Sequence, residues 1–403
     1  MLAALSQTFR EKPLVVAAWL FTAALACRFA VTDLGYALSH DGWRAGPGAM
    51  LGRDFANVFT AGHLFLDGKL SIIYDIAGYR DYQGNLFDGR VIAHNYSYSP
   101  VSFFYVPLFA LGGYGFSYFL WIGVTGLAFM LAARPYLREA GLPAWPALLI
   151  PAAVANVWAG HYGFLFGALW LTAWHLVEKR PRTAGILIGL MIVKPHLALL
   201  MPLALLRRGA WTPIVYAALT VLSLVALSGL AFGWDAWTTY LTQTSAFQAA
   251  MIDEAGEFYL RMMPTTFPAI LLTGLGSGAA WIAQGATAIG AIAALLRWMP
   301  RDPMRAGLAT ATATFLVLPY AFNYDLTVVG IAALIALHRG NDADSIAYRC
   351  AGLLAFLLPL LVINLNDLGI PIAPPVMAGL LAVLLRAEYQ QSAESRAPAL
   401  APA

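Results

Sequence analysis

An acidic residue stands at the start of a predicted short helix in the first long polar stretch of the chain. Asp54 precedes residues 55–66, in which apolar side chains recur at roughly helical spacing. A carboxylate in such a place can act as a general base that takes a proton from an attacking hydroxyl. The alternative is an ordinary N-cap, in which the carboxylate accepts hydrogen bonds from the free N–H groups of the helix and offsets its dipole.

A lysine separates two short apolar runs further along the chain. Lys194 is followed directly by Pro195 and His196. An ammonium group in apolar surroundings is costly unless it meets an anion, so we expect Lys194 to meet a phosphate group, supplied by a lipid. The alternative is a lysine that snorkels toward water. His196 is a candidate for the same pocket, with packing against neighbouring side chains as its alternative.

Three other turns carry polar side chains between apolar runs. His161 could donate a hydrogen bond to a phosphate or to a sugar hydroxyl, or be a structural histidine bonded to a nearby carbonyl. Asp325 either caps a helix or lines the same cavity as Lys194, next to the pocket candidates Asn323 and Tyr324. Arg261 is a candidate for a second phosphate contact.

Tyrosine and serine alternate in residues 95–100, which we interpret as an aromatic wall that includes Tyr98 and suits sugar stacking. In the predicted outer loops no two acids show the Asp-X-Asp spacing of a metal-dependent sugar-transfer site, so we expect neither a metal nor another cofactor. The two cysteines, Cys27 and Cys350, both lie in apolar runs and suggest no disulfide or metal site.

The composition determines which elements must position these residues. The chain is 60% hydrophobic and 11% charged, against about 25% charged in a typical soluble domain. Long apolar runs can satisfy their backbone inside a bilayer only as helices, and the alternating segments of a barrel do not occur. The sequence therefore predicts an all-α polytopic membrane protein. A net charge of +3 gives no reason to expect a nucleic-acid partner.

We count about twelve apolar segments, several of them shorter than the roughly 20 residues of a full span and therefore candidates for half-helices. Residues 99–112 are apolar but rich in proline, and we expect them to form a helix in the membrane interface. The twelve segments are 13–31, 114–133, 143–158, 162–177, 183–193, 196–206, 211–231, 278–298, 304–320, 324–338, 346–364 and 371–386.

Basic residues set the predicted orientation. With the N-terminus inside, sixteen of the 24 lysines and arginines fall on inner connections, as the positive-inside rule requires. The first segment is interpreted as a retained span. Residues 1–388 then form one transmembrane domain, with outer loops 32–113 and 232–277 covering the site. Residues 389–403 are expected to be a disordered tail.

Several of these stretches together resemble glycosyltransferase family 87, of the GT-C superfamily. The resemblance extends over about residues 50 to 330. It rests first on the stretch 52–75 of the first loop, which resembles the first-loop motif of the family. Residues Tyr98-Ser99-Pro100 through Pro107-Leu108 are similar to the Tyr-Pro-Pro stretch of the family. Gly160-His161 is similar to its Gly-Gln turn, and Lys194-Pro195-His196 to its Lys-Pro turn.

The resemblance implies a polytopic enzyme of the plasma membrane that acts on the extracytoplasmic side, like the mannosyltransferases that elongate phosphatidylinositol mannosides. Its donor would be a polyprenyl-phosphate sugar and its acceptor a glycolipid or glycan hydroxyl, with inversion at the sugar carbon. Asp54 carries over as the base, and Arg53 beside it is assigned to the substrate pocket. The mannosyltransferases contact the donor phosphate with a histidine where this chain has Asn323-Tyr324, so His161 or Lys194 is expected to supply that contact.

Two other classes of protein were weighed. A polytopic transporter or lipid flippase predicts charged residues near the bilayer midplane and two related halves, neither of which the sequence shows. A non-catalytic membrane scaffold would leave Lys194 unexplained. The sequence names neither the sugar nor the acceptor.

Overall fold

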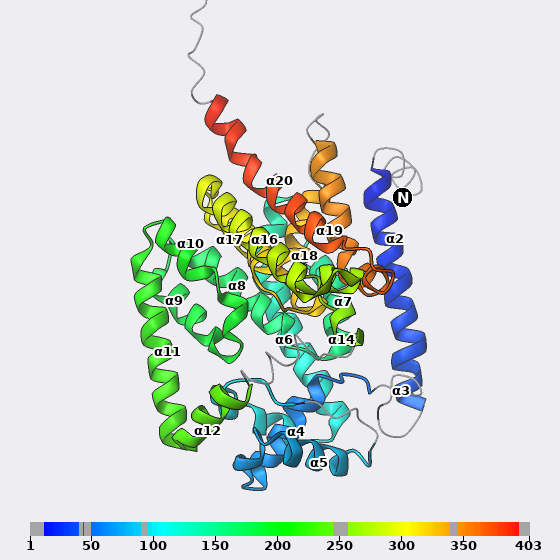
Figure 1. Ribbon diagram of the computed structural model, residues 1–403, viewed down its shortest axis with the longest axis vertical. Helices are drawn as coiled ribbons and strands as arrows, with labels where there is room; N and C mark the ends of the chain where they lie inside the picture. The colour runs from blue at the N-terminus through cyan, green and yellow to red at the C-terminus, as the bar shows by residue number, and fades with distance from the viewer. Residues whose placement is uncertain are drawn as a thin grey trace, which may run out of the picture.

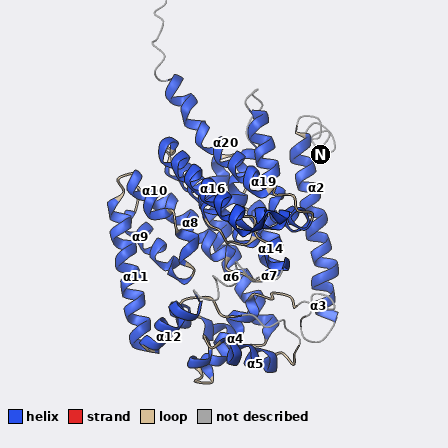
Figure 2. Ribbon diagram, viewed as in Figure 1, coloured by secondary structure: helices blue, strands red, loops and turns tan. Residues whose placement is uncertain are grey.

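The computed structural model describes residues 12–39, 43, 50–89, 95–244, 257–338 and 345–394, and this part of the chain contains helices and no strand (Figure 2). Five of its helical segments are long and apolar enough to cross a membrane: Pro13–Ser39, Tyr114–Glu139, Trp211–Phe232, Thr266–Trp298 and Ile346–Asp367. Several shorter apolar helices accompany them. The predicted class, an all-helical polytopic membrane protein, is confirmed.

Each of the twelve predicted apolar runs coincides with helical structure. The elements are α2 (Pro13–Arg28), α6 (Tyr114–Glu139), η5 (Trp145–Leu148) with α7 (Pro151–Ala159), α8 (Gly163–Leu176), α9 (Pro181–Gly189) with η6 (Leu190–Val193), η7 (Pro195–Ala198) with α10 (Met201–Arg207), α11 (Trp211–Phe232), α16 (Gly276–Trp298), α17 (Pro303–Val317), η10 (Asn323–Asp325) with α18 (Thr327–His338), α19 (Ser345–Asp367) and α20 (Ala373–Glu394).

Several elements differ from the prediction in their bounds or type. Helix α2 continues through η1 (Phe29–Leu34) into α3 (Gly35–Ser39), past the expected end of the first segment. Helix α20 continues to Glu394, beyond the expected start of the tail, because Ala, Glu and Gln there are good helix formers. Instead of one interfacial helix, the stretch 99–112 forms two short 3₁₀ turns, η3 (Pro100–Phe104) and η4 (Val106–Ala110), since each proline removes a backbone donor.

Helices α9 and α11 lie side by side along one edge of the molecule (Figure 1). Two glycines of α9, Gly185 and Gly189, are four positions apart. A Cβ on Gly185 would lie 2.5 Å from the carbonyl oxygen of Pro213, and one on Gly189 would lie 2.5 Å from Cβ of Thr220. The two glycines therefore let the backbones approach closely, which is how small residues promote helix packing in membranes.

Several basic connections meet at the end of the molecule that holds α10. Arg208 donates from Nη2 to Glu178 Oε1 at 2.6 Å and to the carbonyl oxygen of Arg301 at 2.8 Å. Arg207 donates from Nε to the carbonyl oxygen of Leu296 at 2.8 Å. Three connections that the positive-inside rule assigned to the inner side thus lie together.

The opposite end of the molecule is built from α4 (Phe55–Leu66), α5 (Ile76–Leu86) and α12 (Trp234–Thr239) (Figure 1). The predicted helix 55–66 is confirmed, and it is buried. Tyr79 of α5 donates from its hydroxyl to Asn57 Oδ1 at 3.1 Å, so α5 covers the polar face of α4. Shorter elements complete the described chain: η2 (Leu70–Ile72), η8 (Tyr240–Thr244), α14 (Glu257–Arg261), α15 (Thr266–Ile270) and η9 (Leu271–Leu275).

Candidate active site

The turn between α7 and α8 joins the first loop to the helical bundle. Gly160 ends α7 in the left-handed conformation, with φ of 69°, which costs a glycine little. The chain entering α4 uses carbonyl groups that α7 leaves free: the N–H of Gly52 donates to Trp158 O at 3.1 Å, and that of Asp54 donates to Ala159 O at 2.8 Å. A Cβ on Gly160 would lie 2.7 Å from Cβ of Phe55, so this contact requires a glycine.

Asp54 occupies the N-cap position of α4, but its side chain makes no capping hydrogen bond. The residue is 8% exposed. Oδ1 lies 3.5 Å from Nε of Arg53, and Oδ2 is buried without a hydrogen-bond partner among the described residues. The ordinary helix cap is therefore not what the structure shows. A buried carboxylate oxygen left unpaired calls for an explanation other than local stability.

The tyrosine stretch of the first loop lies against two of the turns. Ser99 donates its backbone N–H to the carbonyl oxygen of Val193 at 3.2 Å, which places the stretch beside Lys194. The hydroxyl of Tyr98 lies 3.1 Å from Nε2 of His161. Segments that are far apart in the sequence thus converge on one place.

Lys194 is 5% exposed, and its ammonium group lies 2.8 Å from both carboxylate oxygens of Asp325. The snorkelling alternative is therefore wrong, because the ammonium group is buried against Asp325. A carboxylate of the chain supplies the negative charge that Lys194 needs, and a contact between Lys194 and the donor phosphate stays a prediction. Asp325 also accepts the N–H of Phe322 at 3.3 Å, so it both stabilises its own turn and pairs with the lysine.

His161 lies between Tyr98 on one side and Asp325 on the other. Its Nδ1 is 3.5 Å from Asp325 Oδ1, and its ring stacks on Tyr324 with centroids 4.2 Å apart. Burial lowers the pKa of His161 well below its usual range, and the cations Lys194 and Arg53 lower it further. The imidazole is therefore neutral near pH 7. Nδ1 is buried without a hydrogen-bond partner among the described residues. The tautomer of the ring decides whether Nε2 donates to the Tyr98 hydroxyl or accepts from it.

The remaining candidates are His196, which lies near Lys194, and Asn323 and Arg261, which contact α19. Near Lys194, the ring of His196 lies 5.4 Å from that of Tyr320, which is a packing contact. Asn323 donates from Nδ2 to the carbonyl oxygen of Pro359 at 2.7 Å and thereby ties its turn to α19. Arg261 forms an ion pair with Asp367 at 2.8 Å. The structure thus ties both Asn323 and Arg261 to α19.

Two contacts of the site, made by Asp325 and Met262, were not predicted from the sequence. Asp325 was expected to cap a helix or to line the cavity of Lys194, and its ion pair with Lys194 was not predicted, although a buried lysine needs a negatively charged partner. Met262, whose sulfur accepts from Arg53 Nη2 at 3.0 Å, carries no signal that a sequence could reveal. Within the described ranges, no group of three or more His, Cys, Asp or Glu side chains could hold a metal ion.

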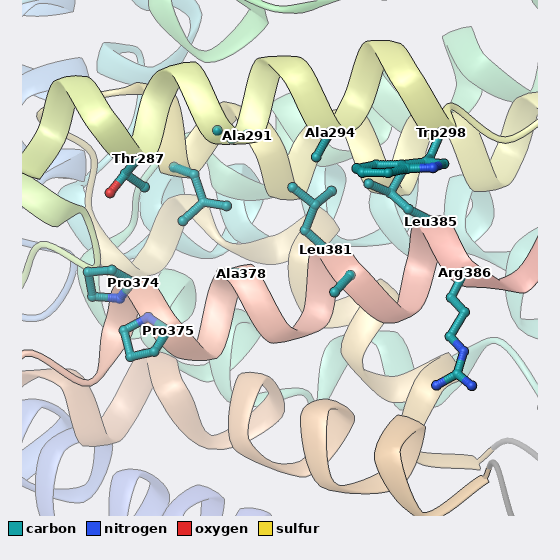
Figure 3. A pocket seen from close by; sticks show the side chains of 13 residues that line it. Thr287, Ala291, Ala294, Trp298, Pro374, Pro375, Ala378, Leu381, Leu385 and Arg386 are labelled. Atoms are coloured by element: carbon teal, nitrogen blue, oxygen red, sulfur yellow. The ribbon is translucent and has the colours of Figure 1, made fainter.

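A separate cavity of about 600 Å³ lies between α16 and α20 (Figure 3). Alanine, leucine and proline side chains form most of its lining, with Trp298 and Arg386 toward one end in Figure 3. None of the candidate site residues lines it. It therefore does not belong to the cluster around Asp54.

Comparison with known proteins identifies the family of the chain. No curated protein and no solved structure matches the chain. The model of glycosyltransferase family 87 matches residues 96–319, more than half of the chain. That range includes Tyr98, His161 and Lys194, whereas Asp54 and Asp325 lie outside it and join the other three through the folded geometry. The chain belongs to glycosyltransferase family 87.

Proposed function

We propose that this chain transfers a sugar, mannose or a similar hexose or pentose, from a polyprenyl-phosphate donor to a hydroxyl of a lipid-linked or glycan acceptor. One observation carries the proposal: Asp54 is buried and keeps Oδ2 unpaired among the described residues, beside the guanidinium of Arg53. Leaving a buried acceptor unsatisfied costs free energy. An acceptor hydroxyl that donates to Oδ2 would remove that cost and place its proton on the base.

In the proposed reaction, Asp54 takes the proton of the acceptor hydroxyl while the acceptor oxygen attacks the anomeric carbon. The bond from that carbon to the phosphate oxygen breaks, and polyprenyl phosphate leaves with the electron pair. A buried cation of the site supplies positive charge where negative charge develops on the leaving group. Attack opposite the leaving group inverts the carbon, so a β-linked donor gives an α-linked product.

The same proposal places the reaction on the extracytoplasmic side of the plasma membrane. In support, α4 and α5 lie at the end of the molecule opposite the basic connections around Arg208 (Figure 1). The outer loops 32–113 and 232–277 would cover the site. The first-loop likeness to mannosyltransferases of phosphatidylinositol mannosides makes mannose the first sugar to test.

The test is to incubate the purified protein with a panel of polyprenyl-phosphate sugars and to score the release of free polyprenyl phosphate. Asp54→Asn removes the base with little change in shape and should lower turnover at least about 10²-fold, the lower range for a general base. Asp67→Asn is the matched control, since Asp67 lies at the other end of α4 with its side chain 44% exposed. Near-normal turnover of Asp54→Asn would overturn the assignment of the base.

A further inference from the structure

Arg53 is a buried cation with an incomplete set of partners. Its side chain is 10% exposed, and a guanidinium carries five N–H donors. Its one hydrogen bond to a described residue runs from Nη2 to the sulfur of Met262 at 3.0 Å, and sulfur is a weak acceptor. Nε has no hydrogen-bond partner in the described part of the chain, because Asp54 Oδ1, at 3.5 Å, is too far for a good one.

Two aromatic rings fix the position of this guanidinium. Its central carbon lies 5.1 Å from the ring centroid of Trp158 and 5.5 Å from that of Phe258. Such contacts stabilise a cation through the faces of its plane. They leave the N–H groups at its edge available for an anion in that plane. The side chain is therefore oriented in advance for a planar, two-pronged contact.

The other cations considered for a phosphate contact already have protein partners. Lys194 is neutralised by both oxygens of Asp325. Arg261 pairs with Asp367 at 2.8 Å. His161 stands between the Tyr98 hydroxyl and the Asp325 carboxylate. Binding a phosphate at Lys194 or Arg261 would first require an existing ion pair to break, and the neutral ring of His161 offers a phosphate no positive charge.

We propose that Arg53 is the residue that binds the phosphate of the polyprenyl-phosphate ligand, and that Lys194 instead positions Asp325 and His161. The inference rests on the proposed function, whose donor class it uses. It assigns the phosphate contact to a residue expected only to line the substrate pocket, in place of Lys194, His161 or Arg261. Arginine forms paired, charge-assisted hydrogen bonds with phosphate, which its open edge permits.

The position beside Asp54 suits an in-line transfer. The acceptor oxygen must lie about 3 Å from the base and about 3–3.5 Å from the anomeric carbon, with the phosphate beyond that carbon. Nε of Arg53 is next to Asp54 Oδ1, so one edge of the guanidinium faces the base while the other N–H groups extend away from it. One arginine would thus hold the leaving group at a fixed separation from the base.

Isothermal titration calorimetry of the purified full chain in lipid nanodiscs tests the inference, with a polyprenyl phosphate and the corresponding polyprenol as ligands. We expect the unmodified protein to bind the phosphate more tightly than the alcohol. Arg53→Gln should weaken phosphate binding by about tenfold to a hundredfold, the effect of losing charge-assisted hydrogen bonds, with binding of the alcohol unchanged. Lys69→Gln is the control, since its side chain is 50% exposed.

Arg53→Lys keeps the charge between the two rings without the fork of donors, and it decides the question should Arg53→Gln fail to fold. A loss of phosphate preference in a folded Arg53→Lys protein supports the inference. Full phosphate preference in either folded variant overturns it. If the unmodified protein itself binds the phosphate no better than the alcohol, the proposed donor class fails instead, which separates the two ideas.

Discussion

The ion pair between Lys194 and Asp325 gives the sharpest test of how the site is held together. Lys194→Met leaves the Asp325 carboxylate, whose side chain is 0% exposed, without its cation. Asp325→Asn leaves the ammonium group, with its side chain 6% exposed, without its anion. Removing one partner of a buried pair costs about 3–5 kcal/mol of stability. Independent effects would sum to about 6–10 kcal/mol in the double variant.

The double variant contains neither buried charge, so the remaining cost is that of lost hydrogen bonds, about 1–3 kcal/mol. We therefore expect Lys194→Met with Asp325→Asn to be more stable than either single variant. Thermal unfolding of the four purified proteins in one detergent measures this, with Lys69→Met and Asp67→Asn as a matched cycle. That exposed pair lies 3.6 Å apart and should contribute at most about 1 kcal/mol. Additive losses at Lys194 and Asp325 would refute the reasoning.

Three further predictions concern the turn after α7. Gly160→Ala should destabilise the protein by at least about 1–2 kcal/mol, because Gly160 has a positive φ and its Cβ would lie 2.7 Å from Phe55. The variant should also release less polyprenyl phosphate in the assay above. An unchanged melting temperature would contradict the predicted loss of stability. Tyr98→Phe removes the hydroxyl beside His161 Nε2 and should cost about 1 kcal/mol together with part of the turnover, whereas a silent variant would show that the contact is incidental. Burial keeps the pKa of His161 low in the folded protein, whereas the pKa of a histidine in the unfolded chain is about 6.5. As the pH falls, the unfolded state therefore binds the proton first. The free energy of unfolding should then decrease as the pH drops below about 6.5. His161→Asn should flatten that dependence in melting curves taken between pH 5 and 8, and an identical slope in both proteins would refute the assignment.

The sequence predicted the parts of this protein that depend on local pattern. Long apolar runs and few charges required a helical membrane protein, and helices formed over all twelve runs. The periodicity of residues 55–66 predicted α4 and placed Asp54 at its start. The boundaries were less certain, since α2 and α20 continue where neither proline nor a strong cap ends them.

The pairing of charged residues was decided by the tertiary structure. Lys194 and Asp325 are 131 positions apart, and periodicity says nothing about which distant turns will meet. From the sequence we expected a lipid phosphate beside the buried lysine, because the residues near Lys194 in the chain supply no negative charge. Only the packing of η10 against the turns at Lys194 and His161 placed a carboxylate there. The same fold left Arg53 Nε and Asp54 Oδ2 buried without hydrogen-bond partners among the described residues.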